Sequence, residues 1–352
     1  MRPDKDTQNQ KSPNFLTFIA YLQIIGIVLV VLGHSFHEYP DSNYGMNLLI
    51  YRMMHSFRMP LFMFVSGFLM VYTSLQKKQK SWKDFTQNKL KRLILPFLVL
   101  SILTFIPRSI MSTYADDPIE FSIESLAKSL LFPENMVIPY YWFLQSSFTL
   151  LVFTFLILSF TKKLNWNNIH VYACLIVLFA LIPYLPFELT SFFSLNNTIN
   201  LGLYFILGCA YCQYNQFIDN FINWNSWWTF IICSIIWSVM FFISENTPLI
   251  PICSIAGIMM CISLSKILIR YNVKILDHLI GANYIIFLLS WYFNIASQQL
   301  LHHFTSFPWW VYTILSLISG IYIPYLFYKY MLAHKNSRIR LFCCKYLGQT
   351  FK

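Results

Sequence analysis

The sequence predicts an all-α integral membrane protein with about ten transmembrane helices and both termini in the cytoplasm. Three observations support this fold class. Of the 352 residues, 57% are apolar and only 11% are charged, whereas soluble domains average about 25% charged residues. Apolar stretches long enough to cross a bilayer recur along the chain. The basic residues gather in alternate connections between those stretches, which is the distribution that oriented membrane insertion produces.

The predicted spans are apolar runs that cover about 30 Å at a helical rise of about 1.5 Å per residue. The first run lacks a small-residue cleavage site, so we expect an uncleaved span rather than a signal peptide. The expected domains are a polar tail over 1–14, one membrane domain over 15–331 and a basic tail over 332–352. In chain order the ten spans are 15–36, 59–75, 93–107, 140–160, 168–185, 199–214, 227–243, 248–268, 280–300 and 309–331.

The basic residues predict the orientation of the spans. With a cytoplasmic N-terminus, 21 of the 25 Lys and Arg residues fall in cytoplasmic segments, seven of them in the connection 76–92. An odd number of spans would place the basic C-terminal tail outside, so an even number satisfies the positive-inside rule. The net charge of +11 then reflects orientation and attraction to anionic membrane lipid. We therefore expect no nucleic-acid partner.

The longest external connection, 108–139, is predicted to contain a short amphipathic helix. Asp117, Pro118 and Glu120 have the spacing of an N-cap, an N1 proline and an N3 glutamate. The apolar residues that follow share one helical face, and the pattern ends before Pro133. Such a helix would lie on the outer interface or cover the bundle as a lid.

The eight cysteines lie mostly in apolar runs, where a thiol behaves as a small hydrophobic group. We predict no disulfide framework. Cys209 and Cys212 form a C-x-x-C pair, but no second pair and no ligating histidine lies nearby in the sequence. Helix packing is the better interpretation of this pair, and we predict no metal site.

The ionisable residues in or beside the spans are the first candidates for chemistry. His34 lies near the outer end of the first span, and Glu38 follows one helical turn later, so the carboxylate could orient the imidazole as a general base. The alternative is an interfacial histidine bonded to water or lipid headgroups. No acidic residue lies in the middle of a span, which weighs against a proton-coupled transporter.

Several ordered motifs resemble the membrane-bound acyltransferase family 3, in particular its polysaccharide or fucose O-acetylase-like branch. The first three are YLQIIGIVLVVLGHS at 21–35, SFRMPLFMFVSGFLM at 56–70 and KLKRLILPF at 89–97. Further similar segments are YYWFLQSSF at 140–148, YFILGCAY at 204–211 and IGANYIIFLLS at 280–290. The resemblance therefore extends over most of the chain.

The resemblance implies an enzyme of the plasma (inner) membrane that transfers an acyl group, commonly acetyl, from cytoplasmic acyl-CoA to a hydroxyl of an extracytoplasmic or lipid-linked glycan. Acetyl-CoA is then a co-substrate, and no cofactor is expected to be bound permanently. His34 matches the histidine that the family is regarded as using in catalysis. Lys89 and Arg92 match a basic pair that would bind the phosphates of coenzyme A, although both could simply be positive-inside anchors.

Three further residues are predicted to support the site. Arg58 stands two residues before Pro60 and could hold a negative charge of the acceptor or a developing oxyanion. Trp142 could stack on a sugar, line the acyl group or anchor the helix at the interface. Gln145 follows one turn later and could donate a hydrogen bond inward.

The chain departs from the family pattern at three positions. Gln23 stands eleven residues before His34, where the family usually has a basic residue. Arg58 stands where the related branch often has histidine, and Trp291 stands where many relatives have histidine. These departures leave a divergent enzyme, or an inactive relative that transports a glycan or lipid-linked intermediate. A purely structural subunit is a third alternative. An acyltransferase needs both His34 and coenzyme A, a transporter should tolerate the loss of His34, and a structural subunit should tolerate the loss of both.

Overall fold

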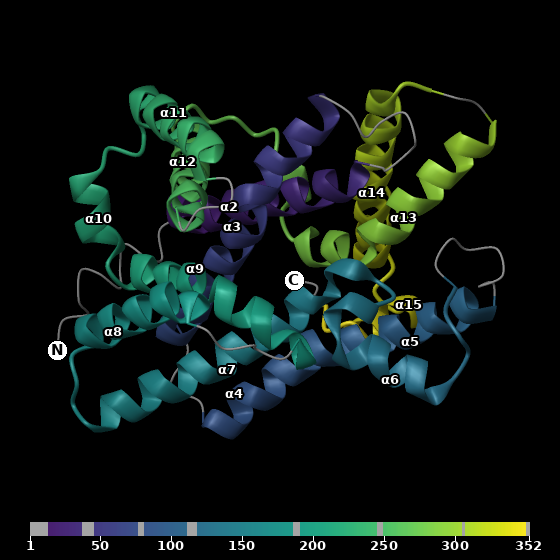
Figure 1. The fold of residues 1–352 in the computed structure, drawn as a ribbon, viewed down its shortest axis with the longest axis horizontal. Helices are drawn as coiled ribbons and strands as arrows, with labels where there is room; N and C mark the ends of the chain where they lie inside the picture. The colour runs from purple at the N-terminus through teal and green to yellow at the C-terminus, as the bar shows by residue number, and fades with distance from the viewer. Residues whose placement is uncertain are drawn as a thin grey trace. The chain divides into compact units, whose positions relative to one another are not determined.

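The computed structural model describes residues 13–36, 46–76, 81–110, 118–185, 191–244, 249–304 and 307–349. Within these ranges the regular structure is helical and contains no strand. The chain forms two compact units, each made of segments distant in sequence. Unit 1 comprises Met1–Phe68 and Tyr211–His334, and unit 2 comprises Leu69–Ala210 and Lys335–Lys352. Figure 1 labels the helices of both units.

Helices occupy the positions of all the predicted spans. Seven helical segments of the described ranges are long and apolar enough to cross a membrane, so the chain is a multi-pass membrane protein. The exact number of spans and their orientation stay predictions. The long helices are α2 (Pro13–Ser35), α3 (Met46–Gln76), α5 (Leu95–Ile110), α7 (Trp142–Lys163), α8 (Asn168–Leu181), α9 (Leu195–Gln213), α11 (Trp227–Ser244), α12 (Ile250–Arg270), α13 (Asn283–Phe304) and α14 (Trp309–Ala333).

Two spans begin earlier than their apolar runs predicted. Helix α3 begins at Met46 rather than at residue 59, which places His55 and Arg58 inside the helix. The segment before α5 is also helical, as α4 (Trp82–Lys89) and the π-helical turn η1 (Leu90–Ile94). Both predicted spans were started where the apolar run begins, so the polar residues before it were left out. A helix continues through such residues wherever their side chains find partners, as Arg58 does over the ring of Tyr51.

The predicted amphipathic helix is present as α6 (Ile123–Leu131), but its predicted start was wrong. Ser122 is the N-cap, and its hydroxyl oxygen accepts a hydrogen bond from the Ser125 amide at 3.1 Å. Pro118–Glu120 is not helical, and Asp117 lies outside the described residues. The serine side chain satisfies an amide of the first turn, so the helix starts there rather than at the proline.

Helix α2 is the centre of unit 1. It packs against α12, α13 and α14, while α13 pairs with α14 and α11 with α12 (Figure 1). Side chains on several sides of α2 are buried, including Leu22, Ile24 and Val31, each with at most 1% of its surface exposed. A helix that is apolar on all sides favours such a central position. Helix α2, which carries His34 in its last turn, is therefore enclosed by three neighbouring helices.

Unit 2 is built around α7, which packs against α4, η1 and α8. The rings of Phe85 on α4 and Phe155 on α7 stack with their centroids 4.0 Å apart. Gly202 of α9 lies against the ring of Phe179 of α8, and a Cβ added at Gly202 would collide with that ring. The remaining helix, α15 (Arg338–Tyr346), packs against α5.

We expect Gly202→Ala to destabilise unit 2 by about 1–3 kcal/mol, because the added methyl overpacks the contact with Phe179. Thermal or denaturant unfolding of the purified protein in detergent measures this loss. The control is Ala173→Val on the exposed face of α8, which enlarges a side chain where there is space. Equal stability of the Gly202 variant and the native protein would contradict the close approach of α8 and α9.

Candidate functional site

His34 lies in the last turn of α2, which ends at Ser35. The imidazole is half-buried. Phe36 follows the helix and contacts the rings of Tyr51 and Trp309, at centroid distances of 6.1 and 6.4 Å. The histidine is thus placed at the edge of an aromatic cluster that α3 and α14 contribute to.

Arg58 of α3 is packed beside this turn. Only 3% of its surface is exposed, and its guanidinium lies so close to Gly33 that a Cβ there would collide with Nη1. Its Cζ lies 5.2 Å from the centroid of the Tyr51 ring. Within the part of the chain that the structure describes, the Nε and Nη1 atoms are buried and have no hydrogen-bond partner. Two donors of a buried cation therefore lie next to the residue that precedes His34.

Pro60 leaves one backbone carbonyl of α3 without its usual helical donor, close to Arg58. A proline has no amide hydrogen, so the carbonyl of Ser56, four residues earlier, lacks its donor within the helix. The Ser254 hydroxyl of α12 supplies that donor at 2.6 Å. The Trp237 indole of α11 also donates to the Ser56 hydroxyl at 3.1 Å. These two bonds fix α3 against the α11–α12 pair, just one turn or less from Arg58.

Two amides of α13 hold the end of α2 that carries His34. Asn294 Nδ2 donates to the carbonyl oxygen of Val31 at 3.3 Å. Gln298 Nε2 donates to the carbonyl oxygen of Ser35 at 3.0 Å and contacts the Ser316 hydroxyl of α14 at 3.1 Å. Both amide side chains are buried. Because the last carbonyls of a helix have no amide partner within it, Gln298 acts as its C-terminal cap, whereas the Val31 carbonyl also accepts a hydrogen bond from the Ser35 hydroxyl at 2.9 Å.

Sequence reasoning missed Asn294 and Gln298 because it searched the spans only for charged and titratable groups. The available signal was their spacing. Two amides four residues apart lie on the same face of a helix. Buried amides within an apolar helix need partners, so a shared face is a reason to expect contacts with another backbone.

Gln23, which was predicted to support the site, does not lie beside His34. Gln23 lies three turns earlier on α2, about 16 Å along the helix axis. Its Oε1 accepts a hydrogen bond from Asn283 Nδ2 at 3.4 Å. Trp291 of α13 is half-buried and packs edge-to-face against Tyr292 at 5.6 Å. Glu38, which we expected to orient His34, lies outside the described residues.

Gln145 and Trp142 belong to unit 2, at the start of α7. Both ends of the fully buried Gln145 amide are used within that unit: Nε2 donates to the Leu130 carbonyl and Oε1 accepts from the Ser194 hydroxyl, each at 2.7 Å. Gln145 thus connects α7 to α6 and to the segment before α9. Trp142 is half-buried and contacts the Phe143 ring edge-to-face at 6.5 Å.

Lys89 and Arg92, the predicted coenzyme A ligands, also belong to unit 2. Lys89 ends α4, and its Nζ lies 5.2 Å from the centroid of the Phe85 ring. Arg92 is exposed and lies in the π-helical turn η1. Such turns are rare and occur frequently at functional sites.

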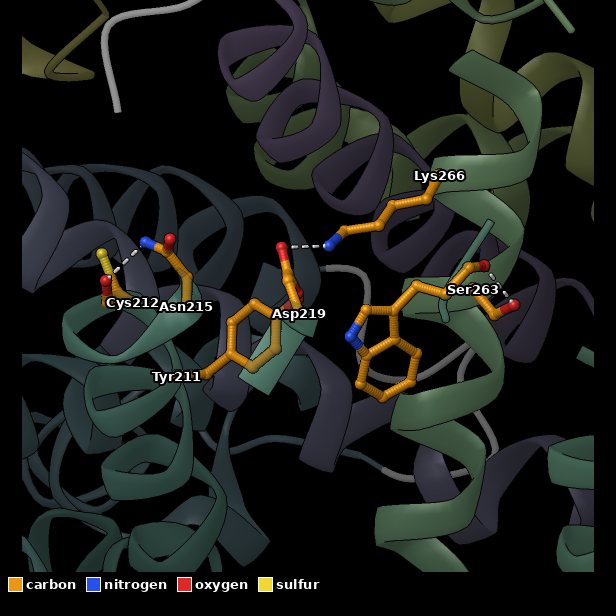
Figure 2. A network of polar contacts seen from close by, with 7 residues as sticks. Tyr211, Cys212, Asn215, Asp219, Ser263 and Lys266 are labelled. Atoms are coloured by element: carbon orange, nitrogen blue, oxygen red, sulfur yellow. Dashed lines mark hydrogen bonds and ion pairs between the residues drawn. The ribbon is translucent and has the colours of Figure 1, made fainter. Parts of the chain in front are cut away.

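A second polar cluster of unit 1 surrounds Asp219 of α10 (Asn215–Phe221) and is shown in Figure 2. Its carboxylate accepts hydrogen bonds from the Tyr211 hydroxyl at 2.9 Å and from Lys266 Nζ at 2.6 Å. Lys266 Nζ also lies 5.3 Å from the ring centroid of Phe18, sixteen residues before His34 on α2. That separation is about 24 Å at the helical rise. The cluster therefore fixes α10 against α12 at the other end of α2.

Cys212 lies beside this cluster, and its carbonyl oxygen accepts a hydrogen bond from Asn215 Nδ2 at 2.9 Å. Neither Cys209 nor Cys212 forms a disulfide within the described residues, and neither has any exposed surface. Their burial within α9 agrees with the interpretation of the C-x-x-C pair as helix packing.

The arrangement around His34 combines a proton acceptor with a source of positive charge. Arg58 and His55 are the ionisable neighbours that act on His34 electrostatically among the described residues. A neutral imidazole accepts a proton from a hydroxyl, and buried guanidinium donors stabilise negative charge on a nearby oxygen. This pair of groups suits the addition of a hydroxyl to a carbonyl carbon.

Comparison with protein families agrees with this chemistry. A family model described as an acyltransferase domain matches residues 16–329. The match covers most of the chain, which therefore belongs to the acyltransferase 3 family. With its several apolar helices, the protein is a multi-pass membrane acyltransferase. Comparisons with curated proteins and with solved structures give no match.

We expect Gly33→Ala to abolish most acyl transfer while leaving the fold intact. The new methyl would displace the Arg58 guanidinium, whereas alanine is favoured over glycine in a helix by about 1 kcal/mol. The measurement is the turnover rate together with thermal unfolding of the same preparation. The control is Gly26→Ala on the same helix, where the nearest atom is a ring carbon of Phe62 at 3.1 Å. Full activity of the Gly33 variant would show that the position of Arg58 is irrelevant.

We expect Gln298→Leu to lower stability by about 1 kcal/mol and to lower turnover, because the Ser35 carbonyl loses its donor at the end of α2. Unfolding midpoints and initial rates measure the two effects. Gln299→Leu changes the exposed neighbour and is the matched control. Two variants that behave alike would contradict the capping role of Gln298.

Proposed function

We propose that the protein transfers an acyl group, most simply acetyl, from cytoplasmic acyl-CoA to a hydroxyl of an extracytoplasmic or lipid-linked glycan in the plasma membrane. The observation that carries this proposal is the packing of the Arg58 guanidinium on Gly33, directly beside His34. Membership of the acyltransferase 3 family supports the reaction class. The resemblance to the polysaccharide O-acetylase-like branch supports the choice of acceptor.

In the proposed reaction His34 acts as general base. The neutral imidazole takes the proton of the acceptor hydroxyl while the hydroxyl oxygen attacks the thioester carbonyl carbon. The negative charge that develops on the carbonyl oxygen is stabilised by Arg58, whose Nε and Nη1 have no partner among the described residues. The carbon–sulfur bond then breaks, and the departing thiolate takes the proton from the imidazolium. The products are the glycan ester and free coenzyme A.

The donor is proposed to approach from the cytoplasmic side, where Lys89 and Arg92 would bind its phosphates. Arginine pairs with phosphate through two parallel hydrogen bonds, and lysine adds a mobile positive charge. The distribution of basic residues in the sequence supports a cytoplasmic position for this pair. Trp142 would contact the acceptor sugar or the acyl group toward the extracytoplasmic side of the membrane.

The departures from the family pattern bear on this proposal in different ways. Gln23 is about 16 Å along α2 from His34, so its lack of charge does not affect general-base chemistry directly. Arg58 contributes a fixed positive charge beside His34, where the related branch often has histidine. We therefore favour an active, divergent enzyme over an inactive relative that transports a glycan intermediate.

We expect His34→Ala to remove incorporation of label from radiolabelled acetyl-CoA into cell-envelope glycans, because the variant lacks the imidazole that accepts the hydroxyl proton in the proposed reaction. The assay compares membranes with matched amounts of native protein, the His34 variant and His170→Ala. His170 is an exposed histidine at the start of α8 and serves as the control. General-base loss typically lowers rates by about 10²–10⁴-fold.

Label incorporation that persists in the His34 variant would contradict the proposed role of this residue. If membranes with and without the protein incorporate the same amount of label, acetyl transfer to envelope glycans is contradicted and the transporter alternative is favoured.

A further inference from the structure

The C-terminal helix α15 is firmly packed within unit 2. Cys343 and Leu347 have 1% and 3% of their surfaces exposed, and Gln349, after the helix, has 4%. The helix begins with Ser337 as N-cap, whose hydroxyl accepts a hydrogen bond from the Ile339 amide at 3.2 Å. The basic tail expected from the sequence thus contains an ordered helix that docks on the rest of the unit.

Gly348 is the point of closest approach between this segment and the turn η1. Its φ is +63°, a conformation that favours glycine, and it ends the helix in the usual left-handed manner. A Cβ at Gly348 would lie 2.9 Å from Arg92 Cα and 3.0 Å from the Lys91 carbonyl oxygen. The two backbones are in contact, so the C-terminal segment has a fixed position against η1.

This contact joins two strongly basic segments. Helix α4 and turn η1 contain four basic residues and one acidic residue, Asp84, and residues 334–352 contain no acidic residue. Lys91, Arg92, Arg338 and Lys345 are all exposed. Like charges brought together on one surface repel each other, and a bound polyanion removes that repulsion.

We propose that α15 and η1 together form the binding surface for the phosphate groups of acyl-CoA. The inference rests on the proposed function and adds the C-terminal helix to the donor site. Coenzyme A carries a diphosphate and a 3′-phosphate, and separate basic segments suit such separated charges. The fixed backbone contact at Gly348 favours a ligand with a defined shape over diffuse attraction to the lipid surface, the other source of phosphate.

The first experiment measures binding of free coenzyme A to the full chain in phosphatidylcholine nanodiscs by calorimetry. We expect the double variant Arg338→Gln/Lys345→Gln to bind about tenfold more weakly, because charge-assisted contacts to phosphate are lost. The matched control is Lys162→Gln/Lys163→Gln at the end of α7 of the same unit. If α15 contacts the 3′-phosphate, the double variant should lose less affinity for dephospho-coenzyme A, which lacks that phosphate, than for coenzyme A.

The second experiment tests the position of α15 without changing any charge. Gly348→Ala should undock the helix, because its Cβ would press on the backbone of η1. Burial raises the pKa of the Cys343 thiol to about 11, so this thiol should alkylate slowly at neutral pH. In a Cys344→Ser background, the Gly348 variant should show faster alkylation of Cys343 and weaker coenzyme A binding.

Each possible result decides the inference. Unchanged coenzyme A affinity in both variants, with Cys343 exposed by Gly348→Ala, would overturn it while leaving the proposed donor intact. A native chain that fails to bind coenzyme A would overturn both proposals. If the charge variants matter only in nanodiscs with phosphatidylglycerol, the phosphates belong to lipid headgroups and the inference is wrong. Weaker binding by both variants in phosphatidylcholine supports it.

Discussion

The need to satisfy backbone carbonyls inside an apolar environment determines how unit 1 is assembled. Hydrocarbon offers no hydrogen bonds, so each carbonyl that a helix leaves open must find a donor within the protein. The Ser35 carbonyl at the end of α2 finds Gln298 on α13, and Asn294 of α13 adds a second donor to the Val31 carbonyl. The carbonyl that Pro60 leaves open finds Ser254 on α12. The positions of His34 and Arg58 follow from these bonds, because each residue lies within about a turn of one of them.

The burial of Arg58 is costly for the free protein and would favour the proposed reaction. A guanidinium in a low-dielectric surrounding, with two donors that have no partner among the residues described, is stabilised by any negative charge that forms beside it. An anionic intermediate at His34 would receive that stabilisation without prior rearrangement of solvent or side chains. The contact with the Tyr51 ring and the absence of a side chain at Gly33 keep the guanidinium in place.

The sequence was sufficient for the positions of the long helices, because their apolar composition is dictated by the membrane. It also made His34 and Arg58 candidates, because a charged or titratable group is conspicuous in a span, and their roles stay predictions. It did not predict that α3 starts at Met46 or that Ser122 caps α6, because local partners decide where helices begin. The roles of Asn294, Gln298 and Ser254 depend on which helices become neighbours, and the pattern of a single helix does not contain that information.

The donors that complete α2 and α3 come from the last third of the chain. Unit 1 joins residues up to Phe68 with residues from Tyr211 onward, and unit 2 occupies most of the interval. During synthesis the first two helices therefore enter the membrane well before α12 and α13 have been translated. Their open carbonyls must be tolerated in the meantime by water, lipid headgroups or the insertion machinery. Biogenesis of this protein thus depends on holding an unfinished N-terminal pair until its partners emerge from the ribosome.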